Sequence, residues 1–215
     1  AGAPGGYYNS PAPDGSRPGA YYINSRDTAA WPKWSLPTLT AHEGIPGHHN
    51  QISLAQEAKG IPFIRSKMLW FGAYGEGWAL YSETVADELG LYENDPAGRI
   101  GYLQSMAFRA ARCVVDTGLH AKKWSKQQAI DYMHQATGDE IAAITTEIER
   151  YCVWPGQATC YMVGRVKIME LREKAKKALG EKFNIKTFHD KVLLQGAMPL
   201  DVLEEVIDDY IKTGA

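Results

Sequence analysis

The spacing of apolar residues along this chain is that of a protein built mostly from helices. Between residues 95 and 120, apolar side chains recur at the intervals of one helix face. These side chains are Ile100, Leu103, Ala107, Ala110, Ala111 and Val114. Proline, glycine and capping residues separate further helix-forming stretches, at about 38–59, 75–89, 125–136, 139–151, 157–179 and 199–212. The pattern therefore predicts a mainly α fold.

The first 35 residues have a different composition. Residues 1–18 are rich in glycine, proline and small polar residues, which is typical of a loop or of an arm laid over another element. Residues 19–24 form an aromatic and β-branched run and are the best strand candidate. We therefore expect an extended arm over residues 1–35 with at most a small β element, followed by one helical domain over residues 36–215.

Candidate chemistry is concentrated in the segment HEGIPGHH, residues 42–49, which holds three of the six histidines. A second acidic segment, GEGWALYSE, follows at residues 75–83. Two imidazoles, a neighbouring carboxylate and a distant carboxylate are the components of a hydrolytic zinc site, which needs three protein ligands and an open position for water. We therefore expect one Zn²⁺ ion here, with Glu43 as the general base that takes a proton from water.

The spacing of these histidines is not the usual one. In the motif H-E-x-x-H the two ligands lie four residues apart on one helix face, but here Pro46 stands four residues after His42. Proline removes a helical hydrogen bond and the following glycine tolerates unusual backbone angles, so we expect a break at this point. Looping out two residues would return His48 to the position of the second ligand. His48 is favoured over His49, which stays open as the alternative ligand or as a substrate contact.

Two glutamates compete to be the third ligand. Glu76 and Glu83 lie seven residues apart, two turns along the same face of the expected helix. Glu76 begins that helix and is assigned to the metal, although a simple charge at a helix N-terminus has the same appearance. Glu83 is assigned to the outer shell, because a metal-bound imidazole usually donates its other N–H to a carboxylate.

Asp116 and His120 stand four residues apart on the long helix, a spacing that allows a carboxylate–imidazole pair. We interpret them as a polar network that supports the zinc site. The alternative is an exposed helix end at which the helix dipole favours a histidine.

Four segments in order carry a resemblance to a known family: HEGIPGHH, YGEGWALYSE, RAARCVVDTGLH (109–120) and WPGQATCYMVGR (154–165). They resemble the bacterial domain-of-unknown-function 885 family, and nearly the whole chain is similar to the C-terminal part of its longer members. That family in turn resembles helical zinc peptidases of the gluzincin kind. The resemblance implies His42, His48 and Glu76 as zinc ligands and Glu43 as the base. The chain departs from the peptidase motif by the two extra residues between the histidines.

The same resemblance implies roles for residues on the helix that follows Trp154. Peptidases of this kind use a tyrosine or histidine to stabilise the oxyanion of the tetrahedral intermediate. Tyr161 is the candidate for this role, and Gln157 and Arg165 are candidate substrate contacts. A core aromatic at helical spacing is the alternative for Tyr161.

Charge and hydropathy narrow the range of partners. The formal net charge of −2, without a basic run, argues against a nucleic-acid partner. No apolar stretch is long enough to span a membrane. Three cysteines without a CxxC spacing argue against cysteine ligation of a metal. A periplasmic or secreted location is favoured over the cytoplasm.

These observations predict an enzyme. We expect residues 36–215 to be the catalytic domain of a zinc peptidase that acts on a peptide substrate, together with the missing N-terminal part of the same protein. One alternative is a zinc hydrolase that acts on non-peptide amides or esters. The other is a non-catalytic, metal-dependent binding module.

Overall fold

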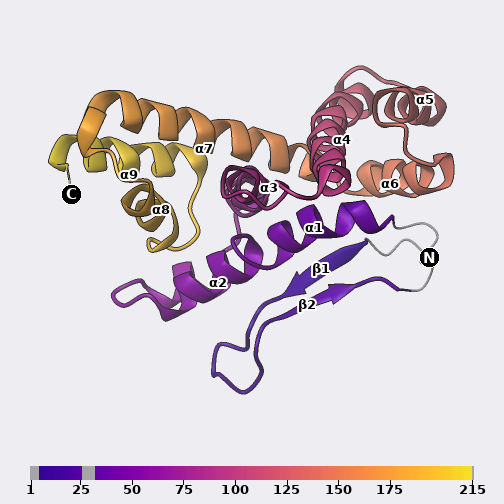
Figure 1. Ribbon diagram of the computed structural model, residues 1–215. Helices are drawn as coiled ribbons and strands as arrows, with labels where there is room; N and C mark the ends of the chain where they lie inside the picture. The colour runs from indigo at the N-terminus through magenta and orange to yellow at the C-terminus, as the bar shows by residue number, and fades with distance from the viewer. Residues whose placement is uncertain (1–4, 26–31, 215) are drawn as a thin grey trace.

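A computed structural model describes residues 5–25 and 32–214 of the chain (Figure 1). The helices in these residues are α1 (Leu36–Glu43), α2 (His48–Glu57), α3 (Gly72–Glu88), α4 (Pro96–Ala121), α5 (Lys126–Thr137), α6 (Ile141–Val153), α7 (Gln157–Leu179), α8 (Ile185–Leu193) and α9 (Leu200–Thr213). A short 3₁₀ turn at Lys33–Ser35 precedes α1. A π-helical turn at Ile64–Met68 lies between α2 and α3, and a second 3₁₀ turn at Gly180–Lys182 lies between α7 and α8. The expected mainly α fold is confirmed. None of the helices within the described ranges has the length and apolar character of a membrane span.

The N-terminal arm forms a β-hairpin that packs against α1 (Figure 1). Strand β1 (Gly6–Asn9) pairs antiparallel with β2 (Ala20–Ile23), and Tyr7 lies opposite Tyr22 with the ring centroids 5.1 Å apart. The strand expected at residues 19–24 is confirmed, whereas β1 lies in a segment that was expected to be a loop or an arm. The glycine-rich composition around β1 did not indicate a strand, but aromatic pairs between the two strands stabilise the hairpin. The division into an arm and a catalytic domain stays a prediction.

The expected interruption lies in residues 44–47, between α1 and α2. Gly47 fits there because it has no side chain: a Cβ atom would lie 1.8 Å from the carbonyl oxygen of His42. The indole N–H of Trp78 on α3 donates to the carbonyl of Pro46 at 2.9 Å. This hydrogen bond attaches the turn to α3.

Most helix boundaries follow the signals in the sequence. The side chains of Asp95 and Ser125 cap α4 and α5 as expected. The expected cap at Asp139 is wrong, because Glu140 is the residue that precedes α6 and Asp139 instead accepts a hydrogen bond from α4. Helix α8 was not predicted from the apolar pattern, and the side chain of Asn184 caps it.

Two clusters of buried apolar side chains hold the helices together. One lies between α3, α7, α8 and α9, and the other lies mainly between α4, α5 and α6. Helix α3 lies near the centre of the molecule and makes its most extensive contact with α7 (Figure 1). The two backbones approach closely where Gly77 meets Gly164, since a Cβ on Gly164 would lie 1.8 Å from the carbonyl oxygen of Ala73. This crossing brings the N-terminal turns of α7 beside those of α3.

The apolar stripe that identifies α4 in the sequence faces outward. Of its six residues only Ala111 is buried, and Ile100 and Leu103 are 63% and 57% exposed. The helix instead buries the face that carries Arg112 and Val115. The helix itself is confirmed, but the spacing of its apolar residues did not identify its buried face.

Replacing Gly164 with alanine is expected to lower the free energy of unfolding by about 1–3 kcal/mol, the usual cost of forcing an extra methyl group into a packed contact. The added Cβ collides with the carbonyl of Ala73 and pushes α7 away from α3. Urea titration followed by circular dichroism measures the change. Val163→Ala is the matched control, because Val163 is the neighbouring residue and is 50% exposed. An equal loss in both variants would contradict the close crossing.

His189 of α8 is expected to make stability depend on pH. Its Nε2 lies 2.8 Å from the hydroxyl of Tyr81, and burial, reinforced by Arg172, lowers its pKa to about 4. Because a histidine in the unfolded chain titrates near 6.5, the unfolded state takes up a proton first as the pH falls. The contribution of His189 is therefore present in full above about pH 6.5 and is lost as the pH falls towards about 4. His189→Gln should flatten this part of the curve of unfolding free energy against pH, and an unchanged slope would contradict the assignment.

Candidate metal centre

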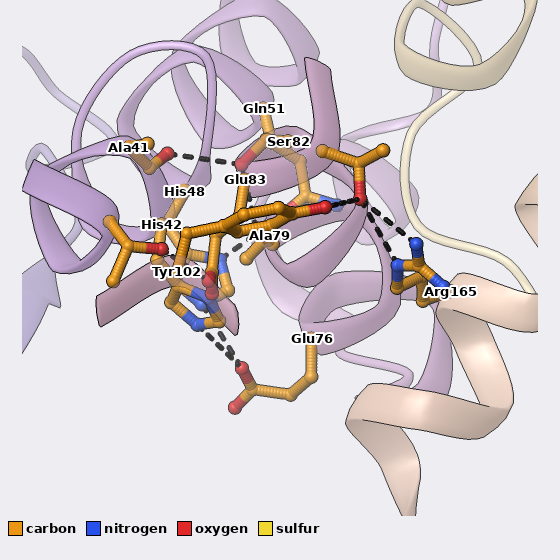
Figure 2. A network of polar contacts seen from close by, with 12 residues as sticks. Ala41, His42, His48, Gln51, Glu76, Ala79, Ser82, Glu83, Tyr102 and Arg165 are labelled. Carbon is orange, nitrogen blue, oxygen red and sulfur yellow. Dashed lines mark hydrogen bonds and ion pairs between the residues drawn. The ribbon is translucent and has the colours of Figure 1, made fainter. Parts of the chain in front are cut away.

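Three side chains from three helices converge on one point (Figure 2). His42 comes from the last turn of α1, His48 from the first turn of α2, and Glu76 from the beginning of α3. The Nε2 atoms of His42 and His48 lie 3.6 and 3.1 Å from the same oxygen, Oε2 of Glu76. One ligand atom from each residue lies within 4.8 Å of the other two. The break at residues 44–47 thus turns both imidazoles towards one carboxylate.

A second side chain holds each histidine from behind. The Nδ1–H of His42 donates to Oε1 of Glu83 at 2.8 Å, and the other oxygen of Glu83 accepts a hydrogen bond from the hydroxyl of Thr38 at 2.5 Å. The Nδ1 of His48 lies 3.3 Å from Oε1 of Gln51. All five of these side chains are buried. Glu83 therefore stands behind His42, in the place that the sequence assigned to it.

These outer hydrogen bonds decide which ring nitrogens carry a proton. When Nδ1 donates, the Nε2 of a neutral imidazole is a lone pair. Both Nε2 atoms then face the carboxylate of Glu76, so three acceptors point at one another with no donor between them. Such a group is stable only when a cation, either a proton or a metal ion, lies among the three atoms.

The distances from the two Nε2 atoms to the Glu76 oxygen fit those between ligands of a zinc ion. Zn–N and Zn–O bonds are about 2.0–2.2 Å long, so two ligands at a tetrahedral angle lie roughly 3.3–3.5 Å apart. The measured separations of 3.1 and 3.6 Å bracket that range. Two imidazoles and one carboxylate also leave a fourth position open, which is typical of catalytic rather than structural zinc sites.

The electrostatics of this centre favour a positive charge. Burial would lower the pKa of His42, but hydrogen bonds to Glu76 and Glu83 raise it to about 9. Burial would also raise the pKa of Glu76, but His42 and His48 hold it well below its usual range. The two carboxylates therefore outweigh the cost of burying a cation between the imidazoles.

Glu43, the expected general base, follows His42 at the end of α1. Its side chain is buried, with 8% of the residue exposed. Its carboxylate has no hydrogen-bond or ion-pair partner in the part of the chain that the structure describes, and neither oxygen is fully enclosed. Glu43 can therefore accept a hydrogen bond from a water molecule.

Tyr161 of α7 lies against the first histidine. Its ring stacks on that of His42 with the centroids 5.9 Å apart and the planes at 23°. The side-chain amide of Gln157 donates to the Tyr161 hydroxyl at 3.2 Å, and Arg112 on α4 donates to the carbonyl of the same amide. Burial and the nearby Glu76 raise the pKa of Tyr161. The hydroxyl therefore keeps its proton at neutral pH and can donate it to an oxyanion.

His49 and Arg165 form their hydrogen bonds with residues other than His42, His48 and Glu76. His49 shares a hydrogen bond of 3.0 Å with the hydroxyl of Tyr8, which attaches α2 to the hairpin. Arg165 donates to the hydroxyl of Thr84 on α3 (Figure 2). Of the two adjacent histidines, the structure thus turns His48 towards Glu76.

Asp116 and His120 are not hydrogen-bonded to each other. Asp116 accepts a hydrogen bond from the N–H of Gly156 at the start of α7, and His120 donates to the carbonyl of Tyr151 on α6. Each side chain therefore connects α4 to a neighbouring segment, and the hydrogen bonds described for them do not reach the three ligands.

Two residues of the site were missed by reasoning from the sequence. Thr38 stands one turn before His42, and Gln51 stands three residues after His48. Intervals of three and four residues place side chains on the same helix face, so this spacing could have found both. Hydroxyl and amide side chains are common on exposed helix faces, and nothing else in the sequence distinguished these two.

Comparison with known proteins relates the chain to a bacterial family. A family model described as "Bacterial protein of unknown function (DUF885)" matches residues 1–207.

Two similar solved structures are both described as a "putative lipoprotein". One, from Colwellia psychrerythraea, is 55% identical over 99% of this chain with a TM-score of 0.96. The other, from Shewanella oneidensis, has no known function and is 27% identical over 94% of this chain with a TM-score of 0.81. The chain spans 36% and 38% of these two proteins, and no curated protein matches.

Glu83→Gln is expected to weaken zinc binding about 10- to 100-fold while leaving the fold intact, because the neutral amide is a poorer acceptor for the Nδ1–H of His42. Competition with a chromophoric chelator measures the affinity, and circular dichroism checks the fold. Glu88→Gln is the matched control, since Glu88 lies on the same helix but pairs with Arg172. Equal affinities in Glu83→Gln and the wild type would contradict the supporting role of Glu83.

Proposed function

We propose that this chain, which belongs to the DUF885 family of bacterial proteins, is a zinc-dependent peptidase that hydrolyses peptide bonds with metal-activated water. One observation carries the proposal. The Nε2 atoms of His42 and His48 lie 3.6 and 3.1 Å from one oxygen of Glu76, while the opposite nitrogen of each ring already has a partner. Three ligands and an open position are what hydrolytic zinc enzymes need.

The residues around the three ligands supply the remaining steps of the reaction. A zinc ion bound there would provide a Lewis acid and lower the pKa of water. Glu43 accepts the proton from that water and passes it to the leaving amine. Tyr161, which is held by its stacking on His42 and by the amide of Gln157, donates a hydrogen bond to the oxyanion.

The location and the partners of the protein belong to the same proposal. The two similar solved proteins are each described as a "putative lipoprotein", which favours a periplasmic or secreted location. A peptide is the proposed substrate. Because the chain spans little more than a third of those two proteins, we also propose that further polypeptide of the same protein contributes to the substrate cleft.

Glu43→Gln is expected to retain the zinc content of the wild type and to hydrolyse peptides about 100- to 10,000-fold more slowly, because the amide cannot take a proton from water. Elemental analysis of protein purified without added metal measures the first quantity. Mass spectrometry of a peptide mixture measures the second. Glu57→Gln is the control, since Glu57 is an exposed residue of the neighbouring helix α2.

Each result separates the proposal from an alternative. Full activity of Glu43→Gln would remove this residue from the mechanism. Cleavage of esters or non-peptide amides without cleavage of any peptide would replace the peptidase with another zinc hydrolase. Zinc binding without hydrolysis of any substrate would favour a metal-dependent binding module.

A further inference from the structure

Two arginines of α4 lie beside the proposed active site without a carboxylate partner. The guanidinium carbons of Arg109 and Arg112 lie 4.1 and 4.3 Å from the centre of the Tyr161 ring. Within the described ranges, neither guanidinium forms an ion pair, and both have enclosed nitrogens that lack a hydrogen-bond partner. Arginine cannot give up its charge in a protein, so an enclosed guanidinium nitrogen without a hydrogen-bond partner is costly. An anionic ligand that reached either guanidinium would supply the missing ion pair.

Arg112 is the structural member of the pair. It is fully buried, and its Nη2 donates to the side-chain carbonyl of Gln157 at 3.0 Å. Its guanidinium also lies 5.1 Å from the ring centre of Tyr151. A ligand cannot reach Arg112 without displacing these neighbours, so its role is to hold Gln157 and the ring of Tyr161.

Arg109 differs because its outer nitrogens are not enclosed. Arg109 is partly buried, and its Nε is enclosed without a hydrogen-bond partner. Neither terminal nitrogen donates a hydrogen bond to the described residues. Burial would lower the pKa of Arg109, but Tyr161, Glu83 and Glu76 hold it above its usual value. The positive charge of Arg109 in turn opposes protonation of His42. Arg109 is therefore a charged group close to the metal ligands with unused hydrogen-bond donors.

We propose that Arg109 binds the C-terminal carboxylate of the substrate, so that the enzyme removes one or two residues from a free peptide C-terminus. The planar guanidinium group matches a carboxylate with two parallel hydrogen bonds. Tyr161 lies close to both Arg109 and the proposed metal ligand His42. Its ring centre is 4.1 Å from the guanidinium carbon of Arg109 and 5.9 Å from the ring centre of His42. One extended peptide residue spans about 3.3–3.6 Å, so a carboxylate on Arg109 belongs to a residue near the bond that is cleaved.

This inference rests on the proposed peptidase function and names the end of the peptide that the site accepts. A purely structural role is the competing account, in which Arg109 only balances the charges of Glu76 and Glu83. The two accounts differ in what they predict for substrates that lack a terminal charge. Loss of a structural role lowers the rates on all substrates by the same factor, whereas loss of a binding role lowers the rate further on those that carry the carboxylate.

The test uses three peptides that differ only at the last position: alanine with a free carboxylate, alanine amide and glutamate amide. We expect the wild type to cleave the free acid with a kcat/KM about 10- to 100-fold above that of the alanine amide. This factor corresponds to the usual free energy of a hydrogen bond between charged groups. In Arg109→Gln this ratio should fall to about one, because only the free acid loses an ion pair with the guanidinium. Arg109→Lys should keep part of the ratio. Arg99→Gln is the control, since Arg99 lies on the same helix with 61% of its side chain exposed.

Other outcomes overturn the assignment. Equal cleavage of the acid and the amide by the wild type would remove the carboxylate from recognition and leave the peptidase proposal intact. An equal loss on both substrates in Arg109→Gln would assign Arg109 to charge balance. A preference for glutamate amide over alanine amide that disappears in Arg109→Gln would assign the side-chain carboxylate of the substrate instead.

A binding measurement tests Arg109 without relying on activity. N-acetylalanine and its amide are titrated into the purified protein and followed by nuclear magnetic resonance. We expect the acid to bind more tightly to the wild type, and this difference to disappear in Arg109→Gln. If no peptide is cleaved, the proposed function fails, yet equal binding of acid and amide to the wild type would still overturn the role of Arg109.

Discussion

The hydrogen bond from His42 to the buried carboxylate of Glu83 is the interaction on which the proposed centre depends. It joins α1 to α3 and fixes the ring so that Nε2 faces Glu76. A buried carboxylate is tolerated only when its oxygens have partners, and the hydroxyl of Thr38 satisfies the second oxygen. Nearby, the hydroxyl of Ser82 donates to a carbonyl of α1, so three hydrogen bonds join the two helices. The direction of the ligand nitrogen is thus set by the packing of α1 on α3.

Glycines set the distances at which the helices meet. The contact between Gly77 and Gly164 lets the backbones of α3 and α7 approach more closely than any side chain would permit. Glu76 directly precedes the first of these glycines, and Tyr161 lies about one turn before the second. The same close approach therefore builds the core and places the phenol near the carboxylate. Gly77 and Gly164, which have no functional side chain, therefore help to position the residues of the site.

The charges of the site also fit the proposed reaction. The carboxylates of Glu76 and Glu83 together match the charge of one divalent ion. Were such an ion bound, neither carboxylate would be left to balance Arg109, and its charge would be available to an anionic group of the substrate. Opposite charges that are buried side by side lower the desolvation cost of one another. In the proposed complex, the same charged side chains would therefore affect the binding of both the metal and the substrate.

The sequence by itself determined the helical class, the break after Glu43 and the set of side chains from which the three candidate ligands come, because these depend on local spacing and on proline and glycine. Only the tertiary structure decided that His48 rather than His49 faces Glu76. Adjacent residues on a helix point about 100° apart, so the position of α3 selects one of them. It also decided that Asp116 finds its partner at Gly156, the residue before α7, and that the apolar stripe of α4 faces outward, because the contacts of a helix depend on its neighbours.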